Sequence, residues 1–409
     1  MHASEILWAL FWIFVAAQVG AEVAGRLRWP SVVGEIVAGC IVGPSVLKLV
    51  VPNQYTQEPL QVLAEIGAVL LLFSVGLETR LDDLKKVGKV AFLVGVLGMV
   101  FPFIFGALWA LATHHPLNRS LFIAAAFVAT SAGITARVLS ELGVLGRIES
   151  RVILGAAVID DIGAMLLLGV VTALQGGSEG VSVVKLLLVL GQAVGFVVLV
   201  GLVGTRFLKR KSEMLDAPIN PHSPLSLALV ACLGLAALAS SIGLAAIIGA
   251  FLGGMAFAET PHRKVLERQV QVLMVFLTPF FFVVTGLQIQ LAQLASVGAI
   301  GTLLFITALA VAGKLMGGML GSRSLGRKSA AIVGVGMVPR GEVGIIVATL
   351  GLGAKVFDER LYALIIAMSL LTSMLAPPIL KRQLAGSAPT PLAPDEDSEL
   401  YRVEATGHG

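Results

Sequence analysis

Long apolar runs follow one another from the start of the sequence to about residue 382, and this pattern restricts the possible folds more than any other feature. A helix that crosses a bilayer needs about 20 apolar residues, and about 13 such runs fit here when short loops are allowed for. Strands of outer-membrane barrels instead alternate polar and apolar residues. Only 13% of the 409 residues are charged, about half the share in soluble domains. The sequence therefore predicts an all-α polytopic membrane protein.

The loops between these runs carry a charge asymmetry that predicts the orientation of the chain. We expect spans at about 4–25, 30–48, 60–78, 88–112, 119–141, 150–174, 183–206, 223–241, 243–259, 268–291, 295–320, 328–351 and 359–381. Most of the 29 Lys and Arg residues lie in loops after odd-numbered spans or just after the last span. Because basic loops stay in the cytoplasm, we expect the N-terminus outside and the C-terminus inside. The net charge of +4 then reflects topology, and no nucleic-acid partner is expected.

The end of the chain differs in composition from the rest. Residues 383–409 are rich in Pro, Ala, Ser and acidic residues, and such a segment does not bury enough apolar surface to order itself. We expect one transmembrane domain over residues 1–382, followed by a disordered cytoplasmic tail.

Two adjacent aspartates, Asp160 and Asp161, lie in the middle of the apolar run at 151–174. An ionised carboxylate at mid-bilayer costs roughly 3 to 15 kcal/mol, and such groups usually pair or line a transport pathway. Neighbouring residues on a helix point about 100° apart. We therefore expect Asp160 to face a partner, Lys314 in the span at 295–320, and Asp161 to face a water-filled cavity. A purely structural Asp160–Lys314 pair is the alternative.

Asp161 would then be the carboxylate that binds a transported ion. A proton and a bound Na⁺ exclude each other at one carboxylate, so their competition would couple the two fluxes. A hard cation prefers oxygen ligands. The hydroxyl groups of Thr130 and Ser131, with carbonyl groups freed by an interrupted helix, are the expected additional ligands.

Two spans contain residues that interrupt a helix. The fifth span has Thr130, Ser131 and Gly133 in its middle, and the twelfth has Pro339 and Gly341. Proline removes a backbone donor and kinks or breaks a helix, and non-helical backbone at membrane depth lines a cavity or is buried in protein. The offset between the two spans is odd, so corresponding helices enter from opposite sides. We expect inverted-topology repeats with two crossed, broken helices, as in secondary transporters.

Arg340 and Glu342 flank the second interruption. Charges near helix ends neutralise the partial charges of unpaired backbone groups. We expect this pair to support the crossing rather than to carry the transported ion.

At these residues the chain resembles the bacterial sodium/proton antiporters of the cation:proton antiporter-2 family, most closely the NapA type. The resemblance covers nearly all of residues 1–382. Its specific part is the double aspartate in LGAAVIDDIGAM (154–165) together with Lys314. Further support comes from VPRGEVGIIVA (338–348), PSVVGEIVAGCIVGPSVL (30–47), LAEIGAVLLLFSVGLE (63–78) and ATSAGITARVLSELG (129–143).

The resemblance implies a homodimer in the bacterial inner membrane that exchanges Na⁺ or Li⁺ for H⁺ by elevator-like alternating access. The mobile core of each protomer would comprise residues at about 88–174 and 295–381, and the other helices would form mainly a dimerisation domain and a linker. Asp161 corresponds by position to the ion-binding carboxylate, Asp160 to the lysine-paired acid and Lys314 to that lysine. Relatives with two adjacent acids are associated with electrogenic exchange, which the resemblance therefore favours.

The remaining motif residues also have counterparts in the family. Thr130 and Ser131 correspond to the unwound segment beside the ion site. Arg340 and Glu342 correspond to a charged pair in the second broken helix.

Other functions are compatible with parts of the pattern. Exchange of K⁺ for H⁺ on the same scaffold is the nearest alternative. A passive cation channel fits less well, because channel filters usually come from symmetric rings of residues. An intramembrane aspartyl protease needs two carboxylates about 3 Å apart that share a proton, whereas neighbours on one helix diverge. We expect a transporter rather than an enzyme, with no cofactor.

Overall fold

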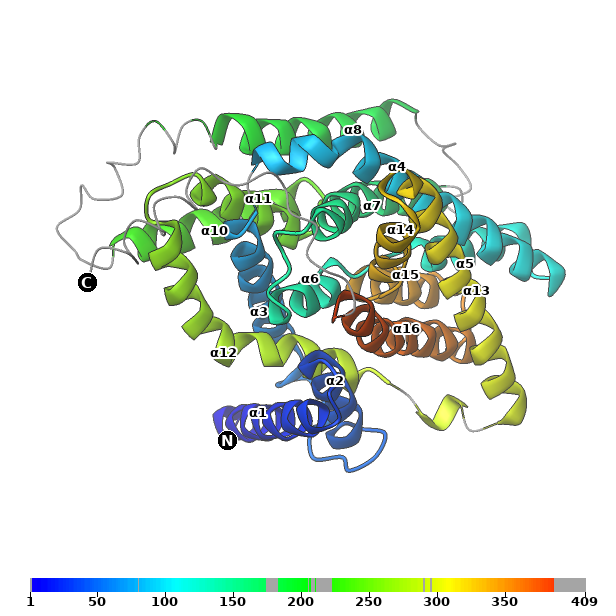
Figure 1. The fold of residues 1–409 in the computed structure, drawn as a ribbon. Coiled ribbons are helices and arrows are strands. Elements are labelled where there is room, and N and C mark those ends of the chain that lie inside the picture. The colour runs from blue at the N-terminus through cyan, green and yellow to red at the C-terminus, as the bar shows by residue number, and fades with distance from the viewer. Residues whose placement is uncertain are drawn as a thin grey trace.

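The computed structural model describes residues 2–79, 81–173, 183–204, 206, 210, 223–289, 291–294 and 296–385, and these residues are helical apart from short connections. Figure 1 shows the helices packed side by side in one body. The expected all-α architecture is confirmed. Residues 386–409, most of the expected tail, lie outside the described residues.

Each expected span corresponds to a helix or to a pair of half-helices. The uninterrupted spans are α1 (His2–Arg26), α2 (Ser31–Val42), α3 (Gln57–Leu77), α4 (Leu81–Ala112), α7 (Ile148–Ala173), α8 (Val183–Val198) with η1 (Leu199–Gly204), α10 (Ser223–Ser241), α11 (Ala246–Ala258), α12 (Arg263–Leu287), α13 (Val297–Gly321) and α16 (Glu359–Ala385). The interrupted spans are α5 (Leu117–Val128) with α6 (Ala132–Glu141), and α14 (Arg327–Gly336) with α15 (Glu342–Gly353). Two short 3₁₀ turns, η3 (Leu291–Leu294) and η4 (Arg323–Leu325), flank α13.

By length and composition, the described residues contain 8 segments able to cross a membrane, with α5 and α6 counted as one, and several shorter apolar helices. Two expected boundaries differ clearly. The fourth span was expected to begin at residue 88, where its apolar run starts, but α4 begins at Leu81, because the helix extends beyond the apolar run into charged residues. The second span was expected to reach residue 48, but α2 ends at Val42. Gly43 and Pro44 follow it directly, and proline cannot continue a helix because it lacks an N–H.

The helices other than α8 and η1 pack in two groups, and these two contact α7 and α11 respectively. The α3 group contains α1, α2, α3, α10, α11 and α12, in which α3 packs on α11 and α12 and α1 packs on α2. The α4 group contains α4 to α7 and α13 to α16, in which α4 packs on α5, α7 and α13. Contacts between the groups involve fewer elements, mainly α6 against α2 and α3, and α16 against α2.

Glycines bring helix backbones into close contact within each group. In the α3 group, a Cβ atom on Gly39 would lie 2.2 Å from Val283 O, and one on Gly76 would lie 2.2 Å from Phe251 O. In the α4 group, a Cβ atom on Gly317 would lie 2.4 Å from Leu97 O. Small residues permit such close approach between membrane helices. Each group is therefore packed too tightly for its helices to slide past one another freely.

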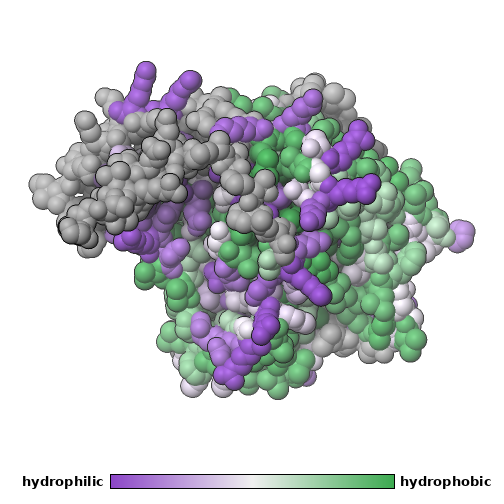
Figure 2. Space-filling model, viewed as in Figure 1, coloured by the Kyte–Doolittle hydropathy of each residue, from purple (hydrophilic) through white to green (hydrophobic). Residues whose placement is uncertain are grey.

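Large apolar side chains also lie on the outside of the molecule. Trp8 and Phe11 on α1, and Val272 and Val275 on α12, are among the exposed ones. Hydrophobic residues cover much of the visible surface, with hydrophilic side chains gathered in patches between them (Figure 2). Soluble monomers rarely expose apolar patches of this extent, so these surfaces suit contact with a lipid bilayer.

Candidate functional site

The two interruptions touch each other near the centre of the α4 group. The first comprises residues 129–131 between α5 and α6, and the second comprises residues 337–341 between α14 and α15. The backbone N–H of Ser131 donates to Pro339 O over 2.8 Å, and the Thr135 hydroxyl donates to Gly336 O over 2.8 Å. The expected crossing of two broken helices is confirmed. Polar groups freed by one break are satisfied by the other.

Local sequence explains where each helix stops. Ser131 caps α6, because its Oγ accepts a hydrogen bond from the backbone N–H of Ile134, a common role for serine. Pro339 cannot donate a backbone hydrogen bond. Gly341 is required by space, since a Cβ atom there would lie 2.6 Å from Ser131 Oγ.

Arg340 is fully buried at the crossing. Its guanidinium donates to Phe127 O and, over 3.2 Å, to Ala310 O. Phe127 lies in the last turn of α5, where carbonyl groups lack helical partners and form the negative end of the helix dipole. The positive charge of Arg340 therefore stabilises the broken end of α5.

The side chain of Glu342 lies outside the described residues, although Glu342 begins α15. The expected Arg340–Glu342 pair thus remains a prediction. Ser373 on α16 also contacts the crossing, because its hydroxyl donates to Arg340 O, and no sequence motif predicted this contact. Ser369 lies three residues before Thr372 and four before Ser373, so the three side chains share one polar face of α16. This face was the pattern in the sequence that could have predicted a polar contact for α16.

Asp160 and Lys314 form the expected pair. Lys314 Nζ lies 2.8 Å from Asp160 Oδ1, and both side chains are fully buried. The second carboxylate oxygen of Asp160, Oδ2, has no hydrogen-bond partner among the described residues. A charge so far from water is costly unless it is paired, so α7 and α13 are joined here by a strong electrostatic contact.

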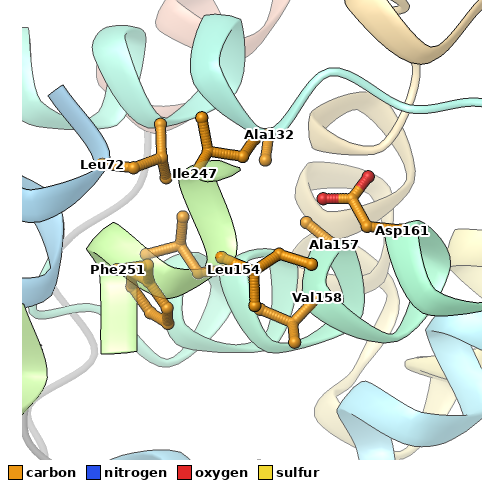
Figure 3. Close-up of a pocket in the computed structure, with 9 residues that line it drawn as sticks. Leu72, Ala132, Leu154, Ala157, Val158, Asp161, Ile247 and Phe251 are labelled. Carbon is orange, nitrogen blue, oxygen red and sulfur yellow. The ribbon is translucent and has the colours of Figure 1, made fainter. Parts of the chain in front are cut away.

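Asp161 faces a different environment from its neighbour. It lines a small pocket between α7, α6, α3 and α11. Figure 3 shows its carboxylate directed toward the side of the pocket where Ala132 lies. The other lining residues are apolar, namely Leu72, Ala132, Leu154, Ala157, Val158, Ile247, Ile248 and Phe251. The pocket thus places one carboxylate at the boundary between the two groups, in apolar surroundings that the motifs did not indicate.

Thr130 and Ser131 lie in the interruption directly before Ala132, which lines the pocket, and neither is itself a lining residue; their role as ion ligands stays a prediction. Both are buried. The Thr130 hydroxyl has no hydrogen-bond partner among the described residues, whereas the Ser131 hydroxyl caps α6. Thr130 is therefore better able than Ser131 to offer its hydroxyl oxygen to a ligand.

Lys314 lies within electrostatic reach of the other charged residues of the site. Asp160, Asp161 and Arg340 all act electrostatically on Lys314. With both acids ionised and both bases protonated, their formal charges sum to zero. Such a neutral cluster limits the cost of burying charge, and binding one cation would disturb that balance.

Comparison with known proteins finds sodium/hydrogen exchangers and antiporters as relatives of this chain. Residues 13–386 match the family described as "Sodium/hydrogen exchanger, transmembrane". The chain is 33% identical over 383 residues to a Na(+)/H(+) antiporter of Enterococcus hirae, an alignment that covers 92% of this chain and 97% of the relative. It is 32% identical over 380 residues to the Na(+)/H(+)-K(+) antiporter GerN of Bacillus cereus, covering 92% and 96% of the two chains.

Among solved structures, the fold is similar to that of the sodium proton antiporter MjNhaP1 from Methanocaldococcus jannaschii. The TM-score is 0.69 at 19% sequence identity, and the superposition covers 94% of this chain and 98% of the other. This likeness concerns the fold. Taken with the match over residues 13–386, it leads to one conclusion: the chain belongs to the sodium/hydrogen exchanger family.

Proposed function

We propose that this protein is a secondary transporter that exchanges Na⁺ or Li⁺ for H⁺, with Asp161 as the group that binds either ion. The observation that carries the proposal is the position of Asp161, a carboxylate lining an otherwise apolar pocket beside two crossed broken helices. The family membership and the names of the bacterial relatives support the same function.

Cation binding would use oxygen atoms around Asp161. The Thr130 hydroxyl is buried and has no hydrogen-bond partner among the described residues, and the interruption at 129–131 presents backbone carbonyl groups. Hard cations prefer such ligands. A proton on Asp161 removes the charge that attracts the cation, so one site holds one or the other.

We propose electrogenic exchange through Lys314, which pairs with Asp160 beside the site. A proton or a Na⁺ on Asp161 brings the summed charge of the four buried residues from zero to +1, and buried net charge is costly. If Lys314 gives up its proton when Na⁺ binds and keeps it when a proton binds, each Na⁺ displaces two protons, so net charge would cross the membrane.

Movement of one helix group against the other would expose Asp161 to each side in turn. We assign the α4 group, about residues 88–174 and 295–381, as the moving core, and the remaining helices mainly as dimerisation domain and linker. Tight glycine contacts within each group support movement as rigid bodies. The pocket lies at the boundary between the groups, where such movement would open it.

We further propose a homodimer in a bacterial inner membrane, with the N-terminus outside and the C-terminus in the cytoplasm. The positive-inside rule supports the orientation. The exposed apolar side chains of α1 suit contact with lipid or with a second copy. Chemical cross-linking in native membranes would capture the dimer, and capture of monomer alone would exclude it.

Proteoliposomes with a clamped membrane potential provide the test. Addition of Na⁺, Li⁺ or K⁺ against a pH gradient should move protons in the wild type, and Asp161→Asn should abolish this movement. Asp358→Asn is the matched control, since Asp358 pairs with Arg119 on the surface. Retained exchange in Asp161→Asn would refute the site, and a response to K⁺ alone would identify K⁺/H⁺ exchange. Cation flux without proton movement would identify a channel.

The same vesicles test the role of Lys314. Lys314→Gln cannot release a proton, so we expect exchange to lose its dependence on membrane potential while cation-dependent proton movement persists. Equal stimulation of the wild type and Lys314→Gln by an imposed potential would show that Lys314 carries no transported proton.

A further inference from the structure

A carboxylate of the α4 group binds the start of a helix in the α3 group. Glu141, the last residue of α6, accepts hydrogen bonds from the backbone N–H of Ser31 over 3.2 Å and from the Ser31 hydroxyl. Arg137, one turn earlier on α6, holds the same carboxylate with an Nε–Oε1 distance of 2.8 Å. The contact therefore joins the two groups at one edge of their boundary.

The contact satisfies a specific need of α2. The first N–H groups of a helix lack partners within the helix, and the residue before α2 is Pro30, which provides no side-chain cap. The Glu141 carboxylate takes the place of that cap and also lies at the positive end of the α2 dipole. The α3 group thus depends on the other group for the cap of one of its helices.

A second carboxylate lies behind this contact. Glu35 is one turn further along α2 and is buried, and its Oε2 atom has no hydrogen-bond partner among the described residues. Arg137 and Glu141 are the charged residues that act on it. Arg137 therefore lies near one acid from each group, Glu141 from the α4 group and Glu35 from the α3 group. The two acids hold its guanidinium at the boundary.

We propose that Ser31, Glu141 and Arg137 form a latch that stabilises the present arrangement of the two groups and opens in each transport cycle. This inference rests on the proposed movement of the α4 group. If that group slides, the end of α6 must leave the start of α2. The Glu141 carboxylate and the first N–H groups of α2 must then both form hydrogen bonds with water instead. The strength of the latch would then set how much of the protein occupies this arrangement.

Cross-linking tests whether the contact opens. In a Cys40→Ala, Cys232→Ala background, Ser31→Cys and Glu141→Cys are joined by a short bifunctional thiol reagent. We expect joined protein to stop transporting and protein treated with a one-ended thiol reagent to continue. The control joins Arg119→Cys to Asp358→Cys, both within the α4 group, and should leave transport intact. Transport by protein joined at residues 31 and 141 would overturn the latch.

A second measurement tests its energetic effect without relying on transport. Gly133 of α6 and Phe281 of α12 are in contact across the boundary, where a Cβ atom on Gly133 would lie 3.2 Å from the Phe281 ring. Gly133→Cys and Phe281→Cys therefore report the present arrangement by their rate of joining. Loss of a helix cap is worth about fivefold in an equilibrium, so Glu141→Ala should reduce the occupancy of this arrangement about fivefold relative to the alternative.

The controls separate this inference from the function it rests on. Asp358→Asn should leave the rate of joining at residues 133 and 281 unchanged, and Glu141→Gln, which keeps one acceptor oxygen, should have a smaller effect than Glu141→Ala. The joining rate reports loss of the present arrangement, and labelling of Gly133→Cys by the one-ended reagent reports gain of the alternative. If Glu141→Ala leaves both rates unchanged, the latch is refuted while antiport stays in place. Absence of cation-dependent proton movement in the uncross-linked background protein would refute the proposed function instead.

Discussion

Asp160 and Asp161 are neighbours in the chain, yet their side chains face different surroundings. Asp160 lies 2.8 Å from Lys314 in the interior of the α4 group, whereas Asp161 lines the pocket at the boundary with the α3 group. The separation follows from the 100° turn between successive helical residues. One acid is thereby held by a base while the next lines the pocket.

The buried pair can be tested by its effect on stability. Lys314→Met leaves the Asp160 carboxylate buried without its partner, and breaking a buried pair costs about 3–5 kcal/mol. Asp160→Asn in the same protein removes the stranded charge, so the double variant should recover much of the loss. Thermal unfolding in detergent would measure both. Equal melting temperatures for Lys314→Met and the wild type would show that the pair contributes little to the fold.

The half-helices form a unit in which each element completes another. Ser131 N–H donates to Pro339 O, Thr135 donates to Gly336 O, and Arg340 donates to Phe127 O. Backbone groups left unpaired in a membrane cost several kcal/mol each. The two breaks are therefore stable together because each supplies partners for the other.

The close approach at this crossing leads to a prediction about Gly341. Gly341→Ala places a methyl group within 2.6 Å of Ser131 Oγ, and overpacking of this kind costs about 1–3 kcal/mol. Gly353→Ala is the control, because beyond its own turn of helix no described atom lies within 4 Å of the Cβ position at Gly353. We expect Gly341→Ala to melt several degrees lower than Gly353→Ala. Equal melting temperatures would mean that the crossing adapts to the added methyl group.

The sequence was sufficient to predict where helices lie and where two of them break. Apolar run length determines a span, and Pro339 and the polar Thr130–Ser131 pair are local signals of interruption. The pairing of distant groups was less accessible. Thr135 and Gly336 are 201 residues apart, and Ser31 and Glu141 are 110 residues apart. These contacts depend on how helices pack, which hydropathy does not report.

At the scale of the whole molecule, glycine contacts hold each group together, while the boundary between groups is lined by side chains. Gly39 meets the backbone of α12 inside the α3 group, whereas Gly133 meets the Phe281 ring across the boundary. A rigid backbone contact cannot yield to an added methyl group, but an aromatic ring moves by a few tenths of an ångström at lower cost. The glycine–backbone contacts therefore keep each group rigid, whereas the side-chain contacts at the boundary suit the proposed movement of the groups.

This difference can be measured with two matched substitutions. Gly39→Ala would place a methyl group 2.2 Å from Val283 O and should destabilise the protein by about 1–3 kcal/mol. Gly133→Ala should change stability less but alter the transport rate, because it acts at the boundary along which we propose that the groups move. Melting temperatures and initial rates in proteoliposomes would separate the two effects. A large loss of stability in Gly133→Ala with an unchanged rate would contradict this division.

The reciprocal hydrogen bonds at the crossing also bear on how such proteins can be recombined. Residues 117–141 carry the donor that serves Gly336 O, and residues 327–353 carry the guanidinium that serves Phe127 O. A chimera that takes only one of these segments from a distant relative would change the side-chain donor of one bond and the position of the backbone carbonyl group that accepts the other. The two segments, nearly two hundred residues apart in the chain, are therefore expected to be exchangeable between relatives as a pair and to fail when exchanged singly.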